Sequence, residues 1–136
     1  MLKPEDFAQS GADKLPGHLN IDVIKVAADE VIAEIKVEKM HMAPNGFMHA
    51  GAVVTLADTT TGYGCVANIP EQAIGFTTIE LKSNHLGTAR SGTIRSVATP
   101  VHLGRSTQVW DAVVSDVETG KTIALFRCTQ MILYPK

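Results

Sequence analysis

One long apolar segment, residues 50–68, limits what this chain can fold into. Small or apolar residues occupy almost every position of Ala50–Asn68, without the alternation that a strand would show. Strands rarely reach this length without a break, so the segment predicts a helix. A helix without a polar face is stable only where other elements cover it, and glycines such as Gly62 and Gly64 let neighbouring backbone approach closely. We therefore expect a central helix that the rest of the fold encloses.

This segment carries one charged residue, Asp58. A carboxylate on a helix that is covered on every side costs free energy unless it is paired or used. Two interpretations of Asp58 stay open. It takes part in chemistry, or it is a structural acid that bonds to threonine hydroxyls of the same helix.

The segments on both sides of the predicted helix have the composition and alternation of strands. These predicted strands are His18–Val26, Glu30–Val37, Phe76–Asn84, Ser91–Leu103, Thr107–Val117 and Lys121–Leu133. Ahead of them, Pro4–Ser10 predicts a short helical turn and Gly11–Gly17 a loop. The order of two strands, one helix and four strands predicts a single α+β domain over residues 1–136, in which a curved antiparallel sheet wraps around one long central helix.

Composition excludes several classes of function. The formal net charge is −2, and the 12 Lys and Arg residues are scattered, so nucleic acid is not an expected partner. No apolar run is long enough to cross a bilayer, and residues 1–17 lack the apolar core of a signal peptide, so we expect no membrane association and a cytoplasmic location. The two cysteines, Cys65 and Cys128, lie in apolar contexts and are interpreted as core residues. No metal-ligand spacing is present, so no metal site is expected.

The loop before the helix and the helix itself carry a family motif. Gly46 stands three positions before His49, Gly51 stands two positions after it, and Asp58 follows at nine positions. With this spacing the chain resembles the hotdog-fold acyl-CoA thioesterases of the PaaI-like (phenylacetic acid degradation) family. The strand order fits the hotdog topology over nearly the whole chain. Two positions depart from the family pattern, Ala43 in place of Asn or Gln, and Ala50 in place of the first glycine after the histidine.

The resemblance implies hydrolysis of an acyl-CoA thioester by a homodimer, or a dimer of such dimers, with no cofactor apart from the coenzyme A of the substrate. It implies that Asp58 is the base or nucleophile, and that Thr78 holds the attacking water or the carboxylate. Asn45 is the candidate replacement for the family's Asn or Gln, if Pro44 reshapes the loop.

The chemistry also follows from the residues. Backbone N–H groups at a helix start can polarise a carbonyl, and those of Ala50 and Gly51 are the candidates. Ala50 and Asp58 are eight residues apart, or about 12 Å along one helix. Reacting atoms must approach to about 3–3.5 Å. Two antiparallel helices from two protomers can bring both groups to one carbonyl, which predicts two equivalent sites per dimer.

The remaining candidates concern substrate binding. The phosphates of coenzyme A favour Arg and Lys at the pocket mouth, and the candidates here are Arg90 and Arg105, with Asn84 and His85 as neighbours. We expect the apolar residues Phe47, Met48 and Val54 to line the acyl pocket.

Simpler interpretations stay open beside these. His49 either caps the helix or acts as an acid–base group, Asn45 and Gly46 form a turn or contribute to the site, and each arginine either binds phosphate or is a solvated surface charge. Two other functions remain alternatives, a hotdog enoyl-CoA hydratase or dehydratase and a non-catalytic acyl-CoA-binding protein. The sequence has no G-x-S-x-G elbow and no P-loop, which argues against a serine hydrolase and a nucleotide-binding fold.

Overall fold

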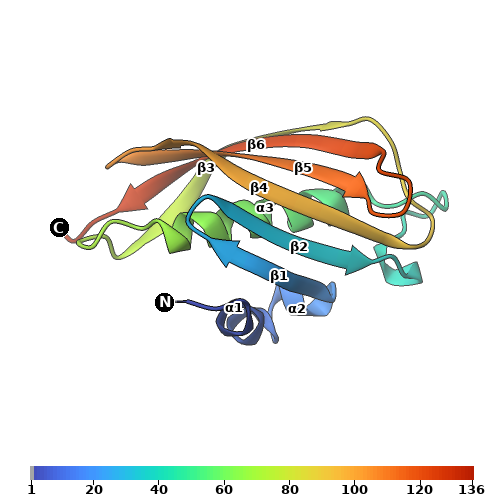
Figure 1. Ribbon diagram of the computed structural model, residues 1–136, viewed down its shortest axis with the longest axis horizontal. Helices are drawn as coiled ribbons and strands as arrows, with labels where there is room; N and C mark the ends of the chain where they lie inside the picture. Colours follow the sequence, from blue (N-terminus) through green and yellow to red (C-terminus); the bar gives the residue numbers. More distant parts are fainter. Residues whose placement is uncertain (1) are drawn as a thin grey trace.

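A six-stranded antiparallel sheet curves over one long helix in the computed structural model, which describes residues 2–136 (Figure 1). The helices are α1 (Pro4–Gly11), α2 (Leu15–His18) and α3 (Ala50–Ala67), with a single 3-10 turn at Lys39–His41. The strands are β1 (Ile21–Ala27), β2 (Glu30–Lys36), β3 (Gly75–His85), β4 (Thr93–Leu103), β5 (Thr107–Asp116) and β6 (Thr122–Leu133). Their order in the sheet is β1-β2-β4-β5-β6-β3. The predicted α+β architecture with one enclosed helix is confirmed.

The N-terminal region differs from the prediction. Residues 11–17 were expected to be loop, but Leu15–His18 forms the one-turn helix α2, with Pro16 in its first turn. Proline fits there because its missing N–H would have no partner at a helix start. The strand prediction from His18 was therefore wrong at its start, since His18 belongs to α2 and β1 begins at Ile21. Apolar content alone does not distinguish one helical turn from the first residues of a strand.

The central helix is covered on most of its surface but not on all of it. Its sheet-facing side includes Leu56, Ala57 and Cys65, which are fully buried. A stripe along the opposite side is only half-buried: Val54, Thr55, Asp58, Thr59, Tyr63, Val66 and Ala67. The expectation that α3 is buried on every side was therefore wrong for this stripe. This less completely covered side is the open side of α3, although Phe7 of α1 packs on Tyr63 there.

Gly64 of α3 lies directly against the Trp110 ring of β5. A Cβ atom at Gly64 would lie 2.5 Å from the Trp110 ring. The ring is fully buried, and its Nε1–H donates to Oε1 of Gln108 at 2.8 Å. Gln108 in turn donates from Nε2 to the main-chain oxygen of Asn68, just after α3. Glycine is therefore required at position 64 because the helix lies directly against an indole ring that is held in place.

The two edges of the sheet differ. At the β1 edge the register shifts between Val23 and Lys25, and α1 packs against the strand. Irregular and covered edges resist pairing with another strand. At the other edge, the register of β3 also shifts, between Thr78 and Glu80, but this strand of 11 residues exposes the apolar side chains of Ile79 (53% exposed) and Leu81 (43% exposed). Within residues 2–136, no helix has the length and apolarity to cross a membrane.

We expect Gly64→Ala to destabilise the fold, because its methyl group would overlap the Trp110 ring. Forcing extra carbon into a packed core costs about 1–3 kcal/mol. The matched control is Gly75→Ala on β3, where an added Cβ meets nothing within 4 Å and φ is not positive. Urea unfolding measures both changes. Equal midpoints for the Gly64 variant and the wild type would contradict the packing argument.

Candidate active site

The loop before α3 is a tight turn that delivers His49 to the helix start. Gly46 has φ = +84°, a backbone conformation that residues other than glycine rarely adopt. The Phe47 N–H donates to Oδ1 of Asn45 at 3.1 Å. A second bond closes the turn, from the Ala43 N–H to the Phe47 carbonyl at 2.7 Å. Asn45 and Gly46 thus have the turn geometry that one of the two interpretations expected.

His49 is the N-cap residue of α3. Its Nδ1 accepts from the Gly51 N–H at 2.7 Å, and its main-chain oxygen accepts from the N–H groups of Ala52 and Val53. The Ala50 N–H has no acceptor among residues 2–136. Of the two amides expected to polarise a carbonyl, that of Gly51 is thus already bonded to the His49 ring. The exposed Ala50 N–H is the one available for a ligand, at the positive end of the helix dipole.

Asp58 sits on the open side of α3, two turns after the helix start. Its Oδ1 is buried without a hydrogen-bond partner in the described chain. The neighbouring threonine hydroxyls of Thr60 and Thr61 bond to main-chain carbonyls instead, the latter to Asp58 O at 3.0 Å. Burial raises the pKa of the Asp58 carboxyl above its ordinary value. The structural-acid interpretation needs hydroxyl bonds to this carboxylate, and those bonds are not present among residues 2–136.

Asp58 and Thr78 line the same cavity. It has a volume of about 210 Å³ and lies between α3, β3 and Pro16 of α2. Its walls are otherwise mostly apolar, and the complete lining is Pro16, Asp58, Thr59, Gly62, Tyr63, Val66, Phe76 and Thr78. The structure thus joins a helix residue to a strand residue 20 positions away, as the resemblance implied. A carboxylate at the wall of a small apolar cavity is an arrangement suited to acid–base or nucleophilic chemistry on a bound ligand.

The expected acyl-pocket residues were wrong for this cavity, since Phe47, Met48 and Val54 do not line it. Met48 is buried in the core, and the Phe47 ring lies under the Arg90 guanidinium. The residues that sequence reasoning missed follow Asp58 at helical spacing, Gly62 and Val66. That i, i+4, i+8 stripe was a usable signal, because such positions share one side of a helix.

The two arginines lie at opposite ends of α3. Arg90 is near the helix start, with its guanidinium carbon 4.5 Å from the centre of the Phe47 ring. Arg105 lies in the turn between β4 and β5, and the Gln108–Asn68 bond fixes this region near the helix end. The 18 residues of α3 span about 27 Å. Within one protomer, therefore, the two arginines do not meet at one site.

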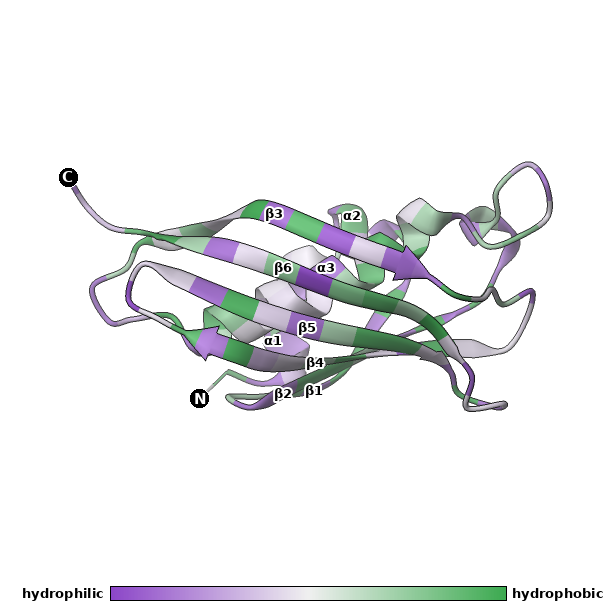
Figure 2. Cartoon of the chain, turned by 90° about the horizontal axis from the view of Figure 1, so that it is seen from above, coloured by the Kyte–Doolittle hydropathy of each residue, from purple (hydrophilic) through white to green (hydrophobic). Residues whose placement is uncertain are grey.

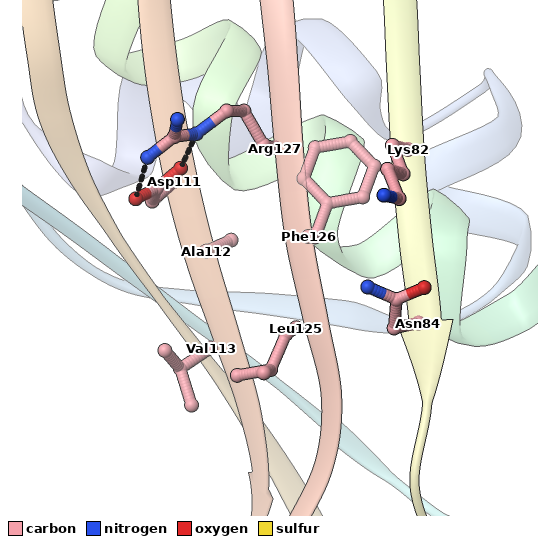
Figure 3. Close-up of a pocket in the computed structure, with 8 residues that line it drawn as sticks. All are labelled: Lys82, Asn84, Asp111, Ala112, Val113, Leu125, Phe126 and Arg127. Carbon is pink, nitrogen blue, oxygen red and sulfur yellow. Dashed lines mark hydrogen bonds and ion pairs between the residues drawn. The ribbon is translucent and has the colours of Figure 1, made fainter.

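Asn84 and His85 end strand β3. Asn84 lines a larger hollow, about 440 Å³, on the outer side of the sheet, away from α3 (Figure 3). Val113 and Leu125 form its apolar part, and Arg127 is paired with Asp111 at one end through Nε–Oδ1 and Nη2–Oδ2 contacts of 2.5 and 2.9 Å. Asn84 is thus separated from Asp58 of its own chain by the sheet. The hollow is distinct from the cavity beside Asp58.

A curved antiparallel sheet around one long central helix is the hotdog fold. Comparison with known proteins gives the family. The family described as the Thioesterase superfamily matches residues 45–123, which include α3 and most of the sheet. The chain therefore belongs to the thioesterase superfamily, and it is a thioester hydrolase.

Relatives and solved structures agree with this assignment. The chain is 33% identical to a 1,4-dihydroxy-2-naphthoyl-CoA hydrolase of Listeria monocytogenes over 82% of its length and 89% of the relative's. It is 32% identical to the hydrolase of the same name from Escherichia coli, over 90% and 89% of the two chains. Its fold matches a variant of thioesterase PA1618 from Pseudomonas aeruginosa with a TM-score of 0.93 and 27% identity, over 99% and 96% of the two chains. The PaaI protein of E. coli, at 22% identity over 96% and 93% of the two chains and a TM-score of 0.81, shares the fold.

The buried charge of Asp58 predicts a pH-dependent stability. Because burial raises the pKa of this carboxyl above 3.8, the ionised form destabilises the folded chain. We expect Asp58→Asn to be more stable than the wild type above the raised pKa, and the difference to shrink as the pH falls through it. Urea unfolding at about pH 7 and about pH 4 measures this difference. The exposed Asp22→Asn is the control, and a gain that does not shrink at the lower pH would contradict the prediction.

Proposed function

We propose that the protein hydrolyses acyl-CoA thioesters at the cavity beside Asp58. The observation that carries this proposal is the half-buried, unpaired Asp58 carboxylate, which shares a small apolar cavity with Thr78. An apolar cavity suits the acyl group, and the carboxylate supplies the reactive oxygen. The names of two relatives, hydrolases of 1,4-dihydroxy-2-naphthoyl-CoA, support a coenzyme A thioester as the substrate class.

The reaction needs no metal or redox cofactor. In the general-base route, Asp58 removes a proton from water, and the water oxygen attacks the thioester carbonyl carbon. In the nucleophilic route a carboxylate oxygen attacks first, and water hydrolyses the resulting anhydride. In both routes the C–S bond breaks and the coenzyme A thiolate leaves and takes up a proton. The Ala50 N–H stabilises the negative charge on the carbonyl oxygen, and Thr78 orients the attacking water or the carboxylate.

The complete site requires a second copy of the chain. Ala50 and Asp58 of one protomer are about 12 Å apart along α3, too far to act on one carbonyl. The cavity adjoins β3, an edge strand whose register is regular over residues 80–85 and which exposes the apolar side chain of Leu81, so this stretch can pair with another strand. Pairing two β3 edges across a two-fold axis sets two open sides of α3 against each other, so that Asp58 of one protomer approaches Ala50 of its partner.

The same arrangement accounts for the separated arginines. Antiparallel helices place the start of one α3 near the end of the other, so Arg90 of one protomer and Arg105 of the other approach one mouth. We propose that they bind the phosphates of coenzyme A there, as bidentate donors.

Two such dimers are expected to associate through the outer side of the sheet. Figure 2 shows apolar stretches along β5 and β6. Val113 and Leu125 are among the exposed residues of these strands. The outer hollow with its Asp111–Arg127 pair would lie in this contact.

We expect Asp58→Asn to lower kcat about 10²–10⁴-fold, the usual contribution of a general base. Steady-state assays over aliphatic and aromatic acyl-CoA esters measure the loss, with Asp22→Asn as the control. Hydration of an enoyl-CoA is assayed in parallel, because its presence without thioester cleavage would favour the hydratase alternative. Tight binding of acyl-CoA without turnover would favour the binding-protein alternative. Turnover by Asp58→Asn within a few-fold of the wild type would exclude Asp58 as the base or nucleophile.

Ala50→Pro tests the carbonyl-polarising amide and the dimer together. Proline removes the N–H but suits the first helical position, and His49 already has φ −66° and ψ 128°, which a following proline requires. We expect Ala50→Pro and Asp58→Asn to be inactive singly. After the two are dissociated, mixed in equal amounts and reassociated, mixed dimers have one intact site of two, giving about a quarter of wild-type activity overall.

A site built within one protomer gives the opposite result. Each protomer of the mixed dimer would then carry one defect of its own, and mixing would restore no activity. Native mass spectrometry would establish whether mixed dimers have formed. If they have formed and the mixture is inactive, the shared site is contradicted.

A further inference from the structure

A second apolar cavity lies at the C-terminal end of α3. It has a volume of about 350 Å³, and its lining is Leu2, Val26, Ala27, Ala28, Val66 and Ala67. These residues come from the start of the chain, the turn between β1 and β2, and the last turn of α3. None of them carries a charge or a polar side chain, so this cavity offers binding to apolar groups and no chemistry of its own.

Val66 is the one residue that lines both this cavity and the cavity beside Asp58. The first cavity follows α3 from Asp58 past Gly62 to Val66, and the second begins at Val66. Eight residues separate Asp58 from Val66, which corresponds to about 12 Å along the helix. The two cavities therefore follow one another along the same open side of α3, with the Val66 side chain at the boundary.

The N-terminal segment lines both cavities, Pro16 the first and Leu2 the second. It also holds α1 against Tyr63, because the ring of Phe7 packs on the Tyr63 ring with centroids 4.6 Å apart. A Cβ at Gly11 would lie 3.1 Å from the Tyr63 hydroxyl oxygen, so α1 and Tyr63 are in close contact. Val66 itself is half-buried and stands where the linings of the two cavities meet.

We propose that the second cavity binds the distal part of an apolar acyl chain, and that Val66 sets the acyl length that the enzyme accepts. This inference rests on the proposed function, since it takes the thioester to lie beside Asp58. At about 210 Å³ the first cavity is smaller than the usual range of ligand sites, about 300–1,000 Å³, and holds a compact acyl group. Chains that extend beyond it must pass Val66 to reach the second cavity.

The test is the acyl-length profile of Val66→Ala. Specificity constants are measured for straight-chain acyl-CoA esters of increasing length and for benzoyl-CoA. We expect the ratio of long-chain to short-chain kcat/KM to rise roughly tenfold or more, the usual effect of removing one or two carbons from a specificity pocket. Val97→Ala, the same truncation on the half-buried outer surface of β4, is the matched control.

A second variant distinguishes an effect of access to the second cavity from a general loss of packing around residue 66. Adding Ala67→Leu to Val66→Ala fills the second cavity only, since Ala67 does not line the first. We expect the double variant to lose the long-chain gain. An unchanged length profile in Val66→Ala, or a gain that survives Ala67→Leu, would overturn the inference.

Affinity measurements with ligands that cannot be hydrolysed test the inference without relying on catalysis. Dissociation constants of non-hydrolysable alkyl-CoA thioethers, measured by calorimetry for the same variants, should show the same dependence on chain length. If the protein hydrolyses no thioester but its affinity depends on chain length and shifts in Val66→Ala, the proposed function is refuted and the two-cavity arrangement is supported. Normal hydrolysis with an unshifted affinity would refute the arrangement alone.

Discussion

The structure depends on a helix that has too little polar surface to be exposed. Six strands curve around α3 because it must be removed from water, and Gly64 allows the sheet to approach as closely as the Trp110 ring permits. A single sheet covers only part of a cylinder. The remaining side of α3 is half-buried, and it is this side that carries Asp58. The candidate site therefore lies at the edge of the sheet, between this side of α3 and strand β3.

The sequence predicted the features that local patterns encode and missed those that depend on contacts between distant segments. The apolar run of residues 50–68 and the alternating strands are local patterns, and they were sufficient for the architecture. Asp58 was identified because a lone charge in an apolar run is unusual. The cavity walls were missed because they combine Pro16, Tyr63 and Phe76 from three elements, and no local pattern specifies such contacts. The turn α2 was missed because four residues carry too little periodicity.

The unpaired carboxylate shows a conflict between stability and chemistry. Asp58 Oδ1 is buried without a donor within residues 2–136, although threonines surround it in the sequence. The hydroxyls of Thr60 and Thr61 donate to main-chain carbonyls of α3, and Thr60 Oγ1 also lies 2.8 Å from Ser96 Oγ of β4. These two hydroxyls are therefore not bonded to the Asp58 carboxylate. A hydrogen-bond donor to the Asp58 carboxylate would stabilise the folded chain and lower the pKa of this carboxyl. In the proposed mechanism, the lower pKa would make Asp58 a weaker base.

The same open side explains why the proposed site uses a second copy rather than a longer chain. The helix start offers an unpaired N–H at Ala50, while the carboxylate lies two turns further on, and a rigid helix keeps them apart. Folding the chain back would need another helix with its own start. In the proposed dimer, a two-fold axis supplies that helix without new sequence and covers the half-buried stripe of α3 and the exposed β3 edge in one contact. Covering the apolar side of α3 and bringing the proposed reactive groups together thus both favour the same two-fold dimer.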